Sequence, residues 1–280
     1  MRASAIIGAG ELGGALAHVL ARIDLVSTIR LIDETGHVAE GKALDVMQAA
    51  PIEGFATAVC GSTDLTTASG AALIILADRA GGGEWQGEDG LLLLKRLSQL
   101  GAGSVVLCAG ASQRELIERG VRELRFARER LFGSAPEALA AAIRAIVALE
   151  ANGSPSDVAL TVLGVPPSQV VVPWEEAAIG GFAATRMLDG TALRRLAARI
   201  APLWPPGTYA LAWAAAKAAE AVLGRSRRRL SGFIAPDDSN GRRARAAALS
   251  LRLGESGVIS DELPPLSVHD RVALDNAMLL

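Results

Sequence analysis

Hydrophobic residues in the first half of the chain form short continuous runs, and the segments between these runs carry apolar residues at helical spacing. This alternation predicts buried strands joined by helices, which is typical of a doubly wound parallel α/β sheet. We expect strands at residues 3–7, 28–33, 71–77 and 104–109. We expect helices at residues 14–23, 38–49, 88–101 and 114–130, the last at the surface because it is charged throughout.

The pattern changes near residue 132, where an alanine-rich helix, expected at residues 136–151, precedes short apolar runs. We therefore predict two domains, residues 1–133 and residues 134–280, the second of the α+β class. Its other expected elements are strands at 158–163 and 169–173, helices at 190–203 and 208–223, strands around 230–235 and 249–258, and a final helix from 267. The glycine-rich segment 79–90 predicts a mobile loop at the rim of the sheet.

The composition excludes several classes of function. Of the 280 residues, 50% are hydrophobic and 21% are charged, with a formal net charge of −2. A nearly neutral chain does not attract nucleic acid, and no apolar stretch reaches the roughly 18 residues that a membrane span needs. The first residues lack the apolar run of a signal peptide. Cys60 and Cys108 have no metal-ligand spacing, so we expect reduced core residues and a cytoplasmic protein.

The sequence AIIGAGELGGA at residues 5–15 carries the most specific motif, because its glycines follow a predicted strand and open a predicted helix. With Asp33 at the end of the next strand, it matches the dinucleotide-binding fingerprint. Gly8 permits the tight turn, Gly10 the approach of a diphosphate and Gly13 the packing of helix on strand, while Asp33 accepts hydrogen bonds from ribose hydroxyls. An acid there repels a 2′-phosphate, so NAD is favoured over NADP. The predicted cofactor-binding residues are Gly8, Gly10, Glu11, Leu12, Gly13 and Asp33. The alternative is that the turn is kept purely as a scaffold.

The segments GHVAEGKALDVMQAAPIEGF at 36–55 and GSTD at 61–64 resemble the malate and lactate dehydrogenase family, with malate dehydrogenase the nearer branch. The resemblance resumes in SDVALTVLG at 156–164, VPW at 172–174, RLGESGV at 252–258 and residues 263–277. It implies a Rossmann-type doubly wound parallel sheet, an α+β C-terminal domain and hydride transfer between NAD and a 2-hydroxy acid. It also implies a homodimer or tetramer. The helix after Asp33 offers an apolar surface to a neighbour through Val38, Ala39, Ala43, Val46 and Met47.

The side chains that this reaction needs are replaced. The resemblance places a catalytic histidine where Pro166 stands, and an aspartate and a substrate-binding arginine where Leu139 and Ala142 stand. Glu137 and Arg144 each lie two residues away, about 200° around a helix, so we expect them to point away from the site. We therefore predict no catalytic residue and no metal site.

Other family positions are also changed. The arginines of the family's mobile loop fall on residues 81–83 and 87, all glycine, with Arg79 nearby, and its asparagine falls on Ala109 or Gly110. Of the three histidines, His18 is expected to be structural and His37 to lie at the surface, while His269 is expected in the first turn of the final helix, without the spacing of a metal site. Trp85 is interpreted either as an aromatic side chain on a lid or as a plain exposed residue.

Two acidic residues bear on the cofactor site. Glu11 lies inside the glycine turn, and Asp78 replaces a glycine that the family has after its third strand. A like charge beside a diphosphate costs on the order of 1 kcal/mol or more. Glu11 is expected to project into solvent.

Three hypotheses follow. The leading one is a noncatalytic, regulatory homologue that binds NAD, with an interdomain cleft that is open to a small-molecule ligand. The second is an NAD-dependent oxidoreductase with an altered substrate, in which Glu175, Glu176 or Asp78 transfers the proton. The third is a structural partner without nucleotide binding.

Overall fold

The glycine turn lies at the carboxyl end of a central strand in a parallel sheet. The structure, a computed structural model, describes residues 2–101, 103–237 and 245–279. The parallel strands run in the spatial order β3-β2-β1-β4-β7-β8, which reverses between β1 and β4. Ligands of doubly wound sheets bind at this reversal, beyond the carboxyl ends of the strands. The strands are β1 (Ala3–Ile7), β2 (Thr28–Ile32), β3 (Ala58–Ser62), β4 (Leu73–Leu76), β7 (Val105–Cys108) and β8 (Leu131–Gly133).

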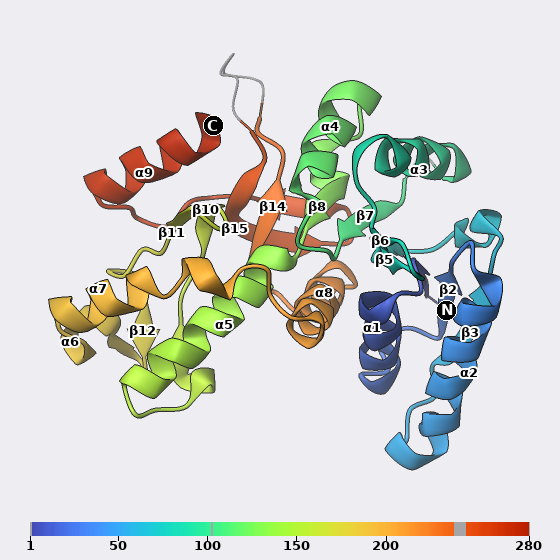
Figure 1. Cartoon of the computed structure of the whole chain (residues 1–280), viewed down its shortest axis with the longest axis horizontal. Coiled ribbons are helices and arrows are strands. Elements are labelled where there is room, and N and C mark those ends of the chain that lie inside the picture. The colour runs from blue at the N-terminus through green and yellow to red at the C-terminus, as the bar shows by residue number, and fades with distance from the viewer. Residues whose placement is uncertain (1, 102, 238–244, 280) are drawn as a thin grey trace.

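Helices cover both faces of this sheet (Figure 1). On one side lie α1 (Glu11–Arg22), α2 (Gly36–Glu53) and α8 (Thr208–Val222), and on the other lie α3 (Gly87–Leu100) and α4 (Arg114–Leu124). Helices α1 and α8 pack against each other. Small, fully buried side chains such as Ala17 and Ala215 allow this close approach.

The sheet continues beyond β8 into antiparallel strands. β14 (Arg229–Ile234) pairs with β8, and β15 (Ala247–Gly254), β10 (Leu163–Val165) and β11 (Gln169–Val171) follow, while β16 (Gly257–Ser260) pairs with β15. Within the described ranges, a single 11-stranded sheet therefore spans both halves of the chain. The second half also contains a small sheet of β9 (Val158–Ala159), β12 (Ala178–Ile179) and β13 (Phe182–Ala183), and the helices α5 (Ala135–Glu150), α6 (Ala184–Met187), α7 (Gly190–Ala198) and α9 (Val268–Leu279).

The largest hydrophobic core joins segments that are far apart in sequence. It contains the strands of the parallel sheet and the helices on both of its faces, together with residues of α8, β14, β15 and β16. A second core lies between α5, α7 and the small sheet, and a third lies beneath α9. The division at residue 133 stays a prediction, whereas the predicted mixed α/β class with a large, mainly parallel sheet is confirmed.

Several expected elements differ from the structure at their ends. The helix expected over 114–130 ends at Leu124, because Arg125 takes a left-handed φ of 57° and turns the chain. The run expected as one strand over 158–163 is divided between β9 and β10, which belong to different sheets. Strand β3 was not expected, because AVCGS is short and mixes small and polar residues with the apolar ones, and in the structure only Val59 of this strand is buried.

The segment 79–90, expected as a mobile loop, contains regular structure. β5 (Asp78–Arg79) and β6 (Gly83–Glu84) form a short antiparallel hairpin, and α3 begins three residues later at Gly87. Gly81 and Gly83 have φ of 73° and 70°. Glycine adopts these values without steric cost, which explains how the chain reverses in so few residues.

Candidate functional site

The glycine turn has the backbone geometry that the motif predicts. Gly8 has a φ of 113°, and its amide donates to the Ile32 carbonyl at 2.7 Å. A Cβ on Gly13 would lie 2.0 Å from the Gly8 carbonyl oxygen, so only glycine allows α1 to start this close to β1. Glu11 is exposed at the first position of α1, as expected, and Leu12 is buried.

Asp78 lies directly over this turn. Its Oδ1 accepts a hydrogen bond from the Gly13 amide at 2.9 Å. A Cβ on Gly10 would meet the Asp78 carboxyl carbon at 2.3 Å, so the space above Gly10 is filled by that carboxylate. The N-terminus of a helix stabilises an anion through its free amides and its dipole. In this chain that anion is a side chain of the protein itself.

Asp33 lies at the end of β2, where the motif predicts it, with only 4% of its surface exposed. Its Oδ2 accepts from the amides of Ala9 at 2.7 Å and Ala80 at 2.9 Å, and its Oδ1 accepts from Thr35 at 2.9 Å. The carboxylate thus links the glycine turn, the start of α2 and the β5–β6 hairpin. These amides take up most of its capacity to accept further hydrogen bonds.

The second acidic residue of the hairpin, Glu84, lies over another loop. Its two carboxylate oxygens accept from the amides of Ala111 at 2.9 Å and Ser112 at 2.7 Å. A Cβ on Gly110 would lie 2.3 Å from the Glu84 carboxyl carbon. The position of Gly110, where the family resemblance implies an asparagine, is therefore packed against this carboxylate.

Trp85 is not an exposed lid residue. It is 8% exposed, and its indole Nε1 donates to the Ile7 carbonyl at 3.3 Å. The Arg79 guanidinium lies 4.8 Å from the centre of its ring, within the range of a cation–π contact. The expectation of exposure was wrong, because the hairpin turns this side chain inward against β1.

A cavity of about 520 Å³ lies between the glycine turn, α2 and the hairpin. Lys42 donates from Nζ to the Gly10 carbonyl at its edge. Positive and negative side chains therefore both face the space where the motif predicts a cofactor. The cavity is lined by Ala9, Gly10, Glu11, Thr35, Val38, Lys42, Asp78, Arg79, Ala80 and residues 81–83.

At the ends of β7 and β8, two buried polar atoms have no hydrogen-bond partner among the described residues: Gln113 Nε2 and Ser134 Oγ. Gln113 is fully buried and accepts through Oε1 from the Gly110 amide at 2.8 Å. Unsatisfied buried polar atoms are rare in native proteins and often mark functional regions. These two lie at the carboxyl edge of the sheet, where ligands of this architecture bind.

Apolar side chains lie at the three positions of the second half where the resemblance implies catalytic groups. Pro166 is buried in the β10–β11 turn, next to Pro167 and Ser168. Leu139 is 0% exposed on α5, within the second hydrophobic core, and Ala142 is partly buried on the same helix. None of these side chains carries a proton-transferring group.

Glu137 and Arg144 form an ion pair with each other on α5. The second oxygen of Glu137 accepts from the Ser231 amide of β14 at 2.9 Å. Both residues line a cavity of about 240 Å³ next to β14, together with Ala159, Leu160, Thr161, Glu176, Arg228, Arg229, Leu230, Ser231 and Ser250. The pair therefore joins α5 to β14. Glu175 is exposed beside Glu176.

The three histidines lie on the helices α1, α2 and α9. Nε2 of His18 lies 2.8 Å from Oε1 of Glu53 on α2, a hydrogen bond that is expected for a structural histidine. His37 is exposed near the start of α2, as expected, and His269 is exposed near the start of α9. In the part of the chain that the structure describes, no group of three or more His, Cys, Asp or Glu side chains has the arrangement of a metal site.

The expectation for Cys60 was wrong: it is exposed on the outermost strand β3, whereas Cys108 is buried as expected. On α2, Ala39, Ala43 and Val46 are buried in the chain's own core, and Val38 and Met47 are partly buried and packed against it. Three of the five apolar side chains expected to face a neighbour therefore serve the chain's own core, and the packing of this helix against a second copy stays a prediction.

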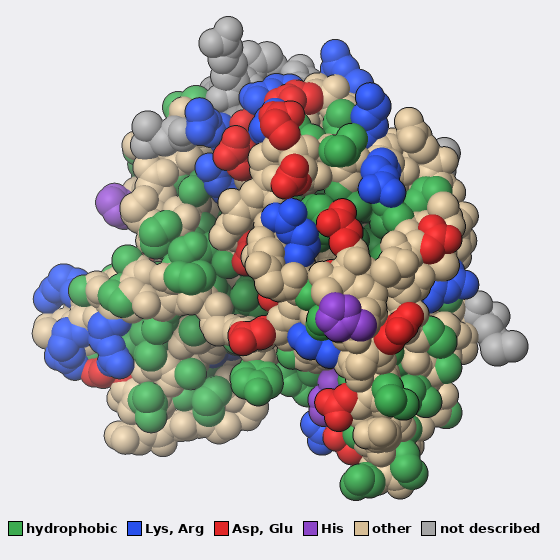
Figure 2. All heavy atoms as spheres, turned by 45° about the vertical axis from the view of Figure 1, so that its right-hand side comes forward, with side chains coloured by type: hydrophobic (Ala, Val, Ile, Leu, Met, Phe, Trp, Pro, Cys, Tyr) green, Lys and Arg blue, Asp and Glu red, His purple; other side chains and the backbone are tan. Residues whose placement is uncertain are grey.

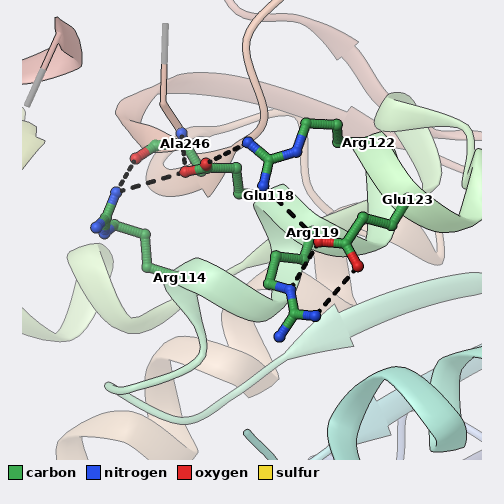
Figure 3. Close-up of polar contacts among 6 residues, drawn as sticks. All are labelled: Arg114, Glu118, Arg119, Arg122, Glu123 and Ala246. Atoms are coloured by element: carbon green, nitrogen blue, oxygen red, sulfur yellow. Dashed lines mark hydrogen bonds and ion pairs between the residues drawn. The ribbon is translucent and has the colours of Figure 1, made fainter. Parts of the chain in front are cut away.

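Charge is dispersed over the surface. On the face drawn in Figure 2, acidic and basic side chains are interspersed. Figure 3 shows how the charges on α4 are paired: Arg119 binds Glu123, while Arg114 and Glu118 hold the backbone of Ala246 at the start of β15. Arg114 and Glu118 thus anchor this helix beside the start of β15. Among the described residues, no helix has the length and apolar character needed to cross a membrane.

Comparisons with known proteins extend over nearly the whole chain, although no family model matches it. A malate dehydrogenase from Thioalkalivibrio sulfidiphilus is 26% identical over 296 aligned positions, which cover 99% of this chain and 96% of that protein. The chain is therefore similar over nearly its whole length to members of the malate and lactate dehydrogenase family. The malate dehydrogenase from Salinibacter ruber has the same fold, with a TM-score of 0.87 at 22% identity over 99% of this chain and 94% of that one. The Cryptosporidium parvum lactate dehydrogenase, solved with lactic acid and NAD, gives 0.86 at 18% identity, with the same coverage of both chains.

The backbone of this chain fits a dinucleotide, whereas its side chains do not fit one in this conformation. The turn formed by Gly8, Gly10 and Gly13 has the tight backbone geometry of the motif, and the missing side chain of Gly10 is what lets a diphosphate approach. The carboxylate of Asp78 fills that approach. A diphosphate and this carboxylate compete for the same helix N-terminus, so the two exclude each other.

The sequence motif missed several residues of the cleft. Lys42, Glu84 and Gln113 contact its turns but belong to no part of the glycine fingerprint. Asp78 was noted as a charge near the diphosphate, without its hydrogen bond to Gly13. The sequence did contain a signal: acidic residues, Asp78 and Glu84, flank the glycines at 81–83. It does not show that this segment forms a hairpin that folds back onto the sheet.

Proposed function

We propose that this chain is a noncatalytic member of the malate and lactate dehydrogenase family that has kept the dinucleotide turn as a ligand site. The observation that carries the proposal is that Pro166, Leu139 and Ala142, at the positions where the resemblance implies the catalytic groups, offer no acid, base or guanidinium. The acid and the guanidinium that α5 does carry, Glu137 and Arg144, are paired with each other and with β14. A hydride transfer from an alcohol needs an acceptor for the hydroxyl proton, so without a free acceptor the barrier stays high even when both reactants bind.

Three observations support a retained ligand site: the backbone of the glycine turn, the cavity of about 520 Å³ beside it, and the two unsatisfied polar atoms at Gln113 and Ser134. NAD is the proposed ligand, through Gly8, Gly10, Glu11, Leu12, Gly13 and Asp33. NAD is bound in one structural relative, the Cryptosporidium parvum enzyme. The role that follows is a sensor or regulatory subunit, and the cleft between the domains at 1–133 and 134–280 is open to a further small molecule.

Titration of the purified protein with NADH, followed by nicotinamide fluorescence, tests the ligand site. We expect saturable binding that ADP-ribose displaces. Absorbance assays with oxaloacetate, pyruvate and a panel of aldehydes and alcohols test the chemistry, beside an active malate dehydrogenase as positive control. We expect no oxidation of NADH above the rate without protein. Oxaloacetate turnover that ADP-ribose inhibits would contradict the proposal.

One observation favours a second candidate, a structural family member that binds no nucleotide. The Asp78 carboxylate already satisfies the Gly13 amide, which in a dinucleotide-binding protein lies at the helix end that stabilises the diphosphate. Absence of saturable binding at millimolar NADH would favour this candidate over the first.

The family also supports a homodimer or tetramer as the working state. The buried residues of α2 do not form its interface, so the exposed Leu44 and Ile52 of that helix are the better candidates. Light scattering across a dilution series measures the mass directly, and a monomer at every concentration would refute the assembly. The free cysteines favour a reducing compartment such as the cytoplasm.

A further inference from the structure

We propose that the β5–β6 hairpin, residues 78–84, is an internal plug of the dinucleotide cleft, in which the carboxylates of Asp78 and Glu84 occupy the positions that a ligand's anionic groups would take. The inference rests on the proposed function, since it concerns the regulation of the same site. Opening the plug is then the step that admits a dinucleotide.

The first contact of the plug is with the glycine turn. Asp78 accepts from the Gly13 amide at 2.9 Å, and its carboxylate fills the space that the missing side chain of Gly10 leaves. The backbone is held as well, because the Gly10 amide donates to the Asp78 carbonyl at 2.8 Å. The carboxylate therefore acts as a substitute for a phosphate at the start of α1.

The second contact has the same chemistry and lies at the loop that follows the neighbouring strand β7. Glu84 accepts from the consecutive amides of Ala111 and Ser112, and it fills the space that Gly110 leaves. Successive backbone amides that point to one place form an anion-binding concavity. Both acidic side chains of the hairpin thus lie against a glycine and accept from backbone amides.

The hairpin is fastened at its sides and free at its tip. The Ala80 amide donates to Asp33, and Arg79 stacks on Trp85. By contrast, a Cβ on Gly81 or Gly83 would meet nothing within 4 Å. The tip is exposed, so the hairpin can leave the cleft as a unit without breaking contacts there.

A dinucleotide has to displace these carboxylates before its diphosphate reaches the turn. When only a fraction of molecules is open, the apparent dissociation constant rises by the inverse of that fraction. Removing one like charge from the diphosphate position tightens binding by about tenfold. We therefore expect NADH to bind Asp78→Gly and Asp78→Asn at least this much more tightly than the unchanged protein.

The experiment compares NADH dissociation constants of the unchanged protein, Asp78→Gly, Asp78→Asn, Glu84→Gln and the Asp78→Gly/Glu84→Gln double variant. Glu255→Gln is the matched control, because it removes one exposed carboxylate whose partner, Arg2, lies just before the amino end of β1, opposite the end that carries the glycine turn. Thermal unfolding confirms that each variant folds. Amide hydrogen exchange supplies a readout that needs no ligand, with faster exchange expected at Gly13 after the Asp78 changes and at Ala111 and Ser112 after Glu84→Gln.

The outcomes separate the two proposals. Tighter binding by the Asp78 variants, with Glu255→Gln unchanged, supports the plug, even if the unchanged protein itself shows no measurable binding. Equal binding by all forms overturns the plug and leaves the proposed NADH site standing. If the double variant also fails to bind NADH, the hairpin is not what excludes the dinucleotide, and both proposals fail.

Discussion

Glu137 and Arg144, two turns apart on α5, form an ion pair in which the second carboxylate oxygen of Glu137 accepts from the Ser231 amide of β14. Their side chains are only 11% and 14% exposed. Counting along the helix predicts that neither residue occupies the positions of the family's catalytic acid and arginine, and this stays a prediction. The structure adds what the two residues do: they join the long helix of the second half to the central sheet.

Removing one member of this pair is expected to destabilise the protein. Arg144→Ala leaves the Glu137 carboxylate nearly buried and without its charged partner, which costs about 3 kcal/mol of unfolding free energy. Urea unfolding measures the loss. Arg194→Ala, on the exposed face of α7, is the matched control and is expected to change stability by less than about 0.5 kcal/mol. Equal effects of the two changes would show that the pair contributes nothing.

The sequence predicted the fold well because buried strands and amphipathic helices leave a periodic signal. Runs such as residues 71–77 are apolar throughout, since a parallel strand is covered on both faces. Strand β3 lacked this signal because it is an edge strand with small and polar residues. Periodicity therefore located the central strands and missed the edge.

The site was predictable only where chemistry depends on local backbone geometry. Gly8 and Gly13 were found because a tight turn and a close helix require glycine at fixed spacing. The contacts of Asp78 with Gly13 and of Glu84 with Ser112 span 65 and 28 residues. Such contacts depend on how a short hairpin folds back onto the sheet, which neither periodicity nor a motif specifies.

The apolar packing around Leu139, where the resemblance implies an acid, is expected to make a carboxylate costly at this position. Leu139 is 0% exposed in the second hydrophobic core, so Leu139→Asp places a carboxylate among apolar side chains without a partner. We expect a loss of more than about 3 kcal/mol in unfolding free energy, measured with urea. Leu139→Met keeps the volume and apolar character and is expected to cost less than about 1.5 kcal/mol. Similar stability of the two variants would show that polar groups are tolerated there.

Asp24 is expected to make stability depend on pH in the acidic range. Its Oδ1 accepts from the Thr57 hydroxyl at 2.8 Å and from the amides of Ala56 and Thr57 at 3.1 and 2.8 Å. The Thr57 hydroxyl, followed by the Ala56 amide, lowers the pKa of Asp24 below its ordinary value. A carboxyl whose pKa is lower in the folded state stabilises the protein above its unfolded pKa, and this stabilisation is lost as the pH falls through the folded value.

Replacing Asp24 with asparagine removes this acid-sensitive contribution. Asn also tolerates the left-handed φ of 52° at this position, so the backbone is not strained by the change. Unfolding free energies from neutral to acidic pH are expected to fall less steeply for Asp24→Asn than for the unchanged protein. Asp45→Asn, at an exposed site on α2, is expected to keep the original slope. Parallel curves for all three proteins would rule out Asp24 as a source of acid sensitivity.

The two thiols are expected to differ sharply in reactivity. Burial, with the nearby charge of Glu84 as a second cause, raises the pKa of Cys108 far above its ordinary value, so this residue stays a thiol at neutral pH. Because the thiolate is the nucleophile, Cys108 is unreactive in the folded protein, whereas the exposed Cys60 is open to attack. A thiol-specific disulfide reagent is expected to modify one cysteine in the folded chain and both after unfolding. Cys60→Ser is expected to abolish the reaction of the folded chain, and rapid labelling of that variant would show that Cys108 becomes accessible through local opening around Glu84.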